Sequence, residues 1–254
     1  MREGRRDREA SFVSFSGIDG AGKSTQIEAL CARMMQDGLR VVVIRFWDDV
    51  ARLTRIRENT GHVIFRGDKG VGSVSAPINR RDKNVTSWFM TAVRLFLYFI
   101  DAISLRLSVK KELRSEVDLV VFDRYAYDEL ANLALNNPII RAYIWLIMKI
   151  VPRPHISYLL DADPEKARAR KPEYPIEFLH INRQSYLALS DLVGGITVIA
   201  PMPVLEVEQA VLRLALAELS FNGHKRNNDN DMVPGEYASE VSTPDRPQTR
   251  SAPL

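Results

Sequence analysis

The sequence predicts an α/β protein in which a parallel sheet carries helices on both faces. Short β-branched and aromatic runs alternate with longer helical patterns along the chain. One of these runs, RVVVIRF at residues 40–46, places β-branched side chains at consecutive positions, as expected of a strand buried in a parallel sheet. A glycine-rich turn at residues 17–24 lies between the first apolar run and the first helical pattern.

Each element follows from its local pattern. The first helix ends before Gly38, because glycine favours a helix end, and the helix at residues 139–151 ends before Pro152, which cannot continue it. The helix at residues 88–109 is apolar on nearly all sides, so we expect it to be buried within the fold or against a second subunit. Strands are expected at residues 12–16, 40–46, 118–123, 155–161 and 196–200. Helices are expected at residues 22–36, 88–109, 139–151, 164–171, 177–192 and 204–219.

We expect one large domain at residues 11–220, between two disordered ends. Residues 1–10 form a short basic arm, and residues 221–254 contain few apolar side chains that could form a core. Residues 51–85 have a weak pattern with scattered glycines, which indicates an irregular insertion. Cys31 is the only cysteine, so no intrachain disulfide can form and a reducing cytoplasm is the expected compartment.

Charge and hydropathy exclude several classes of protein. The formal net charge of +3 comes largely from the arm at residues 2–8, so we expect no nucleic-acid partner. The charged N-terminus has no apolar stretch behind it, which excludes a signal peptide. Charged residues interrupt the two longest apolar regions, at residues 88–109 and 139–151, so no membrane span is expected.

The turn at residues 17–24 matches the phosphate-binding pattern G-x-x-x-x-G-K-S, the P-loop. Its glycines allow positive φ and let backbone N–H groups approach anionic oxygens. We expect Lys23 to reach the β- and γ-phosphates of ATP, and the Ser24 hydroxyl to hold Mg²⁺. The residues expected to bind the nucleotide are Gly17, Ile18, Asp19, Gly20, Ala21, Gly22, Lys23, Ser24 and Thr25.

Two acids and an arginine complete this prediction. Asp19 is unusual among phosphate-binding amides; it either points outward as a turn residue or acts on a substrate hydroxyl or metal-bound water. The run DLVVFD at residues 118–123 has the Walker B pattern, which makes Asp123 a second group for Mg²⁺. Arg124 and Tyr125 follow as candidate substrate-binding residues, since an arginine at this edge is well placed to grip a second phosphate.

Other cations are candidates by their position after a strand. Arg45 ends the second strand at the edge where ligands bind in open α/β sheets, and it is either a substrate-binding residue or a paired arginine of a rim loop. Arg168 and Arg170 belong to a basic run after the fourth strand. This run is either a catalytic lid over the phosphates or a solvated basic face.

Four segments, in the same order along the chain, resemble the thymidylate kinase family of nucleoside monophosphate kinases. The resemblance implies a P-loop NTPase fold of three layers, with a five-stranded parallel sheet between helices. It implies that the P-loop holds ATP, that Asp19 positions substrate or metal, and that Arg124 binds the acceptor's phosphate. It also implies that Tyr98 stacks on the acceptor base and that Arg168 and Arg170 lie in or near a lid. The segments are FSGIDGAGKSTQ at 15–26, FDRY at 122–125, PRPHISYLLDADPEKA at 152–167 and EFLHINRQSYLAL at 177–189.

The sequence departs from the family on the acceptor side. Arg45 matches the family arginine, but Phe-Trp-Asp-Asp follows it in place of Glu-Pro-Gly-Gly-Thr. Ala102 replaces an arginine, and Ser16 replaces the acid that usually precedes the P-loop. The sequence therefore supports ATP use better than it supports thymidylate as the acceptor.

The predicted function is transfer of the γ-phosphoryl group of MgATP to a nucleoside monophosphate, with dTMP as the favoured acceptor. One alternative is a P-loop kinase for another small acceptor, such as a sugar or a lipid-linked group. A second is a non-catalytic ATP-binding module that uses ATP to order an interface formed by its apolar helices. A homodimer through those helices is a further expectation.

Overall fold

A computed structural model describes residues 10–46 and 88–230 of the chain, with side chains at 10–46 and 91–218. The chain divides after Glu218 into two units. Residues 1–9 of the predicted arm, the predicted insertion at 51–85 and the tail from residue 231 lie outside the described residues, as do Asp48 and Asp49.

The predicted five-stranded parallel sheet is confirmed. Every neighbouring pair is parallel, and the strand order is β2-β3-β1-β4-β5. The chain reverses its direction of winding at β1, and in open α/β sheets ligands bind outside the carboxyl ends of the strands at this point. The bounds are Ser11–Ser16 for β1, Val41–Arg45 for β2, Leu119–Asp123 for β3, Ile156–Leu160 for β4 and Ile196–Ile199 for β5.

Each predicted helix is present, and the described residues contain one short helix that was not predicted. The short helix, α4, follows β3 directly, and at its start the Asp128 carboxylate accepts a hydrogen bond from the Tyr125 N–H. The last helix, α8, continues to Asn230, so residues 221–230 are helical where we expected the disordered tail. The bounds are Lys23–Gln36 for α1, Trp88–Glu112 for α3, Ala126–Leu130 for α4, Pro138–Ile150 for α5, Pro164–Arg170 for α6, Ile176–Val193 for α7 and Val204–Asn230 for α8.

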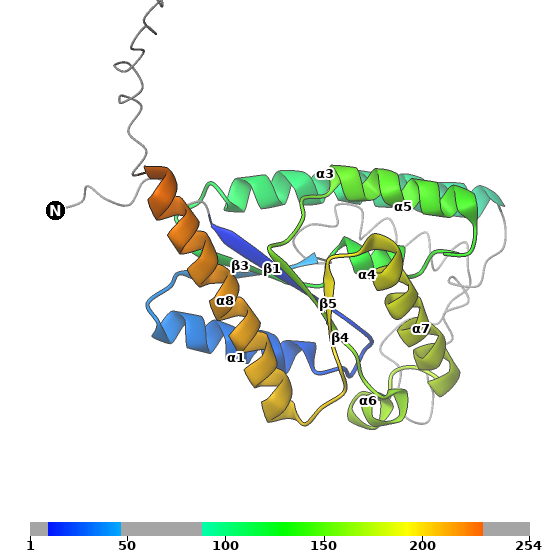
Figure 1. Ribbon diagram of the computed structural model, residues 1–254. Helices are drawn as coiled ribbons and strands as arrows, with labels where there is room; N and C mark the ends of the chain where they lie inside the picture. Colours follow the sequence, from blue (N-terminus) through cyan, green and yellow to red (C-terminus); the bar gives the residue numbers. More distant parts are fainter. Residues whose placement is uncertain (1–9, 47–87, 231–254) are drawn as a thin grey trace, which may run out of the picture. The chain divides into compact units, whose positions relative to one another are not determined.

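Helices cover both faces of the sheet (Figure 1). On one face, Phe12 and Phe122 pack into a cluster shared with α3, α4, α5 and α7. On the other face, Phe15 stacks on Tyr158 at a centroid distance of 4.8 Å, and the Tyr158 hydroxyl donates to the Val211 carbonyl of α8. Side chains of one strand thus alternate between two cores, which explains why the strands are apolar at nearly every position.

The helix α3 is buried on one side only. Ala102, Leu105 and Val109 face the core, whereas Phe96 is 63% exposed and Leu107 is 56% exposed. None of the helices in the described ranges is both long enough and apolar enough to cross a bilayer. Because apolar side chains of α3 are exposed, packing of this helix against a second subunit stays a prediction.

Candidate active site

The P-loop is built so that only glycine fits at its turn. Gly20 has φ +82°, and a Cβ there would lie 2.2 Å from the carbonyl oxygen of Ala167 in α6. Gly17 is similarly close to β4, since a Cβ on it would lie 2.5 Å from the Leu160 carbonyl oxygen. The loop is therefore held between β4 and α6 by contacts between backbone groups, which a side chain would prevent.

The start of α1 is left open for an anion. Gly22 is the N-cap residue, and it offers no side chain to the first N–H groups of the helix. No acidic residue lies in the first turn, where it would compete with a bound phosphate. Ser24 and Thr25 are exposed in this turn. Unpaired N–H groups and the positive end of the helix dipole together form a site for phosphate oxygens.

Lys23 lies inside the loop, with only 7% of its surface exposed. Its Nζ donates to the Gly17 carbonyl at 2.8 Å and to the Ile18 carbonyl at 2.9 Å. Burial and the positive charge of Arg124 lower the pKa of Lys23 to about 8, while Asp19 and two further carboxylates partly oppose the shift. The ammonium group thus has carbonyl partners that phosphate oxygens can replace, and an anion there would raise its pKa again.

Asp123 stands at the carboxyl end of β3, beside the P-loop. It is in register with Phe15 of β1, two residues before Gly17, and with Arg45 of β2 on its other side. Its carboxylate is close enough to Lys23 to contribute to that residue's electrostatics. An acid here and a hydroxyl at Ser24 suit Mg²⁺, which binds proteins through one or two such groups and takes its other ligands from phosphates and water.

Arg124 joins the P-loop to α4. Its φ is +69°, in the left-handed region, and its N–H donates to the Phe15 carbonyl at 3.0 Å. The guanidinium forms a short hydrogen bond to Asp19 and lies 3.4 Å from the Asp128 carboxylate. Burial alone would raise the pKa of Asp19, but the charges of Arg124, Lys23 and Lys171 lower it overall. Asp19 is therefore an ionised partner of Arg124 and not a turn residue that points into solvent.

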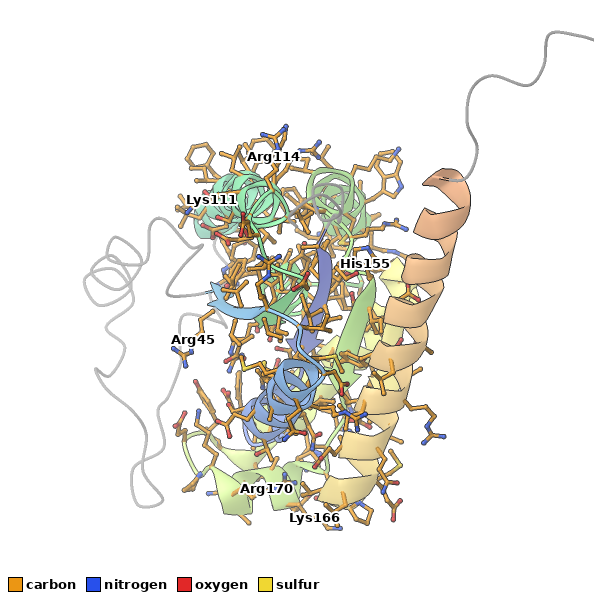
Figure 2. All side chains as sticks on the ribbon, turned by 90° about the vertical axis from the view of Figure 1, so that its left-hand side faces the viewer. Arg45, Lys111, Arg114, His155, Lys166 and Arg170 are labelled. Carbon is orange, nitrogen blue, oxygen red and sulfur yellow. The ribbon has the colours of Figure 1, made fainter. Side chains whose placement is uncertain are left out.

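The basic run of α6 lies against the P-loop. The Nη1 atom of Arg170 would be 3.6 Å from a Cβ on Gly22, and Arg170 Nε donates to the Lys166 carbonyl at 3.3 Å. Figure 2 shows both side chains on this helix, away from Arg45. Arg168 is half-buried, and Lys171 reaches Asp19 at 3.9 Å. Arg170 therefore stands at the loop, as a lid residue would.

Arg45, Tyr98 and Tyr125 were also predicted to bind substrate, but their side chains have surroundings different from those of the P-loop residues. Arg45 is exposed at the end of β2 and points away from the sheet (Figure 2). Tyr98 is half-buried on α3 and packs against the core. Tyr125 is fully buried, and its hydroxyl donates to the Pro152 carbonyl, so its side chain lies in the core and not beside Arg124's guanidinium.

Two groups near the site were not predicted. Asp128, four residues after Arg124, is buried and forms an ion pair with it; the i, i+4 spacing was the available signal. Arg183 of α7 donates to both oxygens of Asp161, at 2.6 and 2.7 Å. This pair lines a recess together with Gly17 and Ile18, so it fixes α7 against the strand that supports the P-loop.

No family model matches the sequence. Curated relatives do match it over most of its length. It is 28% identical over 219 residues to a probable thymidylate kinase of Pyrobaculum calidifontis, covering 82% of this chain and 98% of the relative. A probable thymidylate kinase of Methanothermobacter thermautotrophicus is 25% identical over 209 residues, covering 80% and 93%. A thymidylate kinase of Bifidobacterium longum (strain DJO10A) is 29% identical over 191 residues, covering 70% and 83%. The parallel sheet, the glycine-built P-loop and the Asp123-Arg124 pair agree with these similarities, and together they support a divergent, thymidylate kinase-like protein with a P-loop α/β kinase fold.

Proposed function

We propose that the protein transfers the γ-phosphoryl group of ATP to a nucleoside monophosphate, with dTMP as the favoured acceptor. An oxygen of the acceptor's phosphate attacks the γ-phosphorus, the bond from that phosphorus to the β–γ bridging oxygen breaks, and ADP leaves. The observation that carries the proposal is the P-loop itself, where Lys23 is buried among loop carbonyls beside an uncapped helix start.

On the donor side, the loop's N–H groups and Lys23 bind the phosphate chain. Lys23 exchanges the Gly17 and Ile18 carbonyls for phosphate oxygens, which gives its buried charge a negatively charged partner. Ser24 and Asp123 would hold Mg²⁺, which would supply charge neutralisation on the phosphates. Arg168 and Arg170 on α6 supply further positive charge where the γ-phosphoryl group is transferred.

On the acceptor side, Arg124 binds the phosphate of the nucleoside monophosphate. Its guanidinium lies between the P-loop and α4 and can present two N–H groups to one phosphate. Asp19 orients the acceptor or a metal-bound water from the P-loop side. Tyr98 stacks on the base, and Arg45 contributes from the end of β2; the sequence resemblance supports these two assignments.

We further propose a cytoplasmic homodimer. The support is the apolar stripe of α3, where Phe96, Ile103 and Leu107 are exposed, next to α5, where Trp145 is 62% exposed. The two helices lie side by side (Figure 1), and the Tyr143 hydroxyl of α5 donates to the Leu95 carbonyl at 2.6 Å. Analytical ultracentrifugation tests this: Leu107→Glu should shift the sedimenting species to the monomer.

The proposed reaction is tested by an acceptor panel with ATP and Mg²⁺, in which mass spectrometry identifies the product. We expect dTMP to be converted to dTDP, and Lys23→Ala to abolish conversion while the far-UV circular dichroism spectrum is unchanged. Conversion of a sugar or lipid-linked group instead of any nucleotide would reassign the acceptor. ATP binding without turnover of any acceptor, together with an ATP-dependent change of oligomeric state, would identify a binding module.

A further inference from the structure

Asp128 is a carboxylate near the site with several hydrogen-bond partners, although the reaction proposed above does not use it. It is 3% exposed at the start of α4. Its Oδ2 accepts hydrogen bonds from the Ser16 hydroxyl at 2.7 Å and from the Tyr125 N–H at 3.1 Å. Its Oδ1 accepts from the Tyr186 hydroxyl at 2.6 Å and lies 3.4 Å from Arg124 Nη1. Groups from β1, α7 and the β3–α4 junction thus converge on one carboxylate.

These contacts fix the carboxylate in position. The bond from the Tyr125 N–H ties the Asp128 side chain to the backbone at the start of α4. Burial raises the pKa of Tyr186 well above its usual value, as does the negative charge of Asp128, so the Tyr186 hydroxyl remains a donor. The cation next to this buried carboxylate is Arg124.

Arg124 is held from two sides by carboxylates that differ in accessibility. The Asp128 side chain is 2% exposed, whereas Asp19, in the P-loop, is 16% exposed. Asp19 lies where phosphate oxygens approach the loop, so an incoming phosphate competes with Asp19 for the outer N–H groups of the guanidinium. The Asp128 carboxylate is enclosed, and its hydrogen bond to the Tyr186 hydroxyl ties α4 to α7.

We propose that Asp128 is the positioning residue that holds the Arg124 guanidinium at the site, and that Asp19 is the carboxylate which the acceptor's phosphate displaces from it. This inference rests on the proposed function for the identity of the ligand. It assigns different roles to the two acids: Asp128 remains bound to Arg124 throughout, and Asp19 is released when the acceptor binds.

The first test measures the position of Arg124 without turnover. Full-length wild type, Asp128→Asn and Glu129→Gln are treated with phenylglyoxal, and labelling of Arg124 is followed by peptide mass spectrometry. Glu129 is the matched control, because it is the next residue, is 4% exposed and acts electrostatically on Tyr143. We expect Arg124 to be labelled about 10-fold faster in Asp128→Asn, and within about 2-fold of wild type in Glu129→Gln. Equal rates in Asp128→Asn and wild type would overturn the proposal.

The second test separates the acceptor from ATP. In Asp128→Asn we expect KM for the nucleoside monophosphate to rise by about 10- to 100-fold, the range for losing a hydrogen bond to a charged group, with KM for ATP within about 3-fold of wild type. The double variant Ser16→Asp/Asp128→Ser moves the carboxylate across the 2.7 Å hydrogen bond and should recover most of the loss. Equal increases in both KM values would mean that Asp128 is only structural. If no acceptor is turned over by wild type, the kinase assignment fails, while the labelling result still decides the role of Asp128.

Discussion

The P-loop and the Arg124 cluster lie beside each other but are held by different forces. The P-loop is shaped by its backbone: glycines with positive φ pack against carbonyls of β4 and α6, and Lys23 donates to the loop itself. The Arg124 cluster is shaped by side chains, because one guanidinium is placed between Asp19 and Asp128. The P-loop is therefore sensitive to added volume, and the Arg124 cluster is sensitive to removed charge.

The largest effect expected at the P-loop is on turnover. Lys23→Met keeps most of the volume but removes the only group that the P-loop buries as a cation, so kcat should fall by about 1,000-fold or more. Stopped reactions analysed for ADP measure this. Lys149→Met, on an exposed helix position where the lysine lies over Trp145, is the control and should retain wild-type turnover. A Lys23→Met enzyme within 10-fold of wild type would contradict the donor assignment.

A larger residue at a P-loop glycine should lower the stability of the folded protein. Gly20→Ala places a methyl group 2.2 Å from the Ala167 carbonyl oxygen, so α6 or the loop must move, and we expect a loss of about 3 to 5 kcal/mol in the free energy of unfolding. Gly38→Ala is the matched control, since Gly38 has φ +83° but a Cβ there would have no neighbour within 4 Å. Backbone strain alone should lower its free energy of unfolding by about 1 kcal/mol. Urea denaturation of both variants gives the comparison, and equal losses would show that packing against α6 is unimportant.

The buried charge of Lys23 should appear in the pH dependence of stability. The folded pKa of about 8 lies below the usual 10.5, so the unfolded chain binds this proton more tightly. Unfolding therefore takes up a proton between pH 8 and 10.5, and wild type should gain roughly 3 kcal/mol of stability over Lys23→Met as pH rises through this window. Unfolding free energies of both proteins at pH 7, 8, 9 and 10 test this, and parallel curves would contradict it.

The smallest effect concerns a residue predicted to bind substrate. Tyr125→Phe removes the hydrogen bond to the Pro152 carbonyl from the core, which should cost about 1 kcal/mol of stability. Because the Tyr125 side chain faces the core, the KM for the acceptor should stay within 2-fold of wild type. The acceptor KM is measured together with the melting temperature. A rise in that KM of more than 2-fold would indicate that Tyr125 takes part in binding the acceptor.

Local patterns predicted the sheet, the P-loop and the position of Asp123, because each depends on residues that are adjacent in sequence. Tyr125 was predicted to bind substrate because it follows Arg124, whereas its side chain is buried and donates to the Pro152 carbonyl. The backbone of Arg124 has a left-handed φ, which changes the direction of the chain just before Tyr125. The pattern of apolar and polar residues does not reveal such a change at a single residue. Asp128 was missed because its partners Ser16 and Tyr186 lie 112 and 58 residues away. Such a network is visible only after the chain has folded.

The contact between Gly20 and Ala167 has a mechanical consequence. The loop's backbone lies so close to that of α6 that no side chain fits between them. Under the proposed function, a nucleotide that widened the turn would therefore push on the helix that carries Arg168 and Arg170.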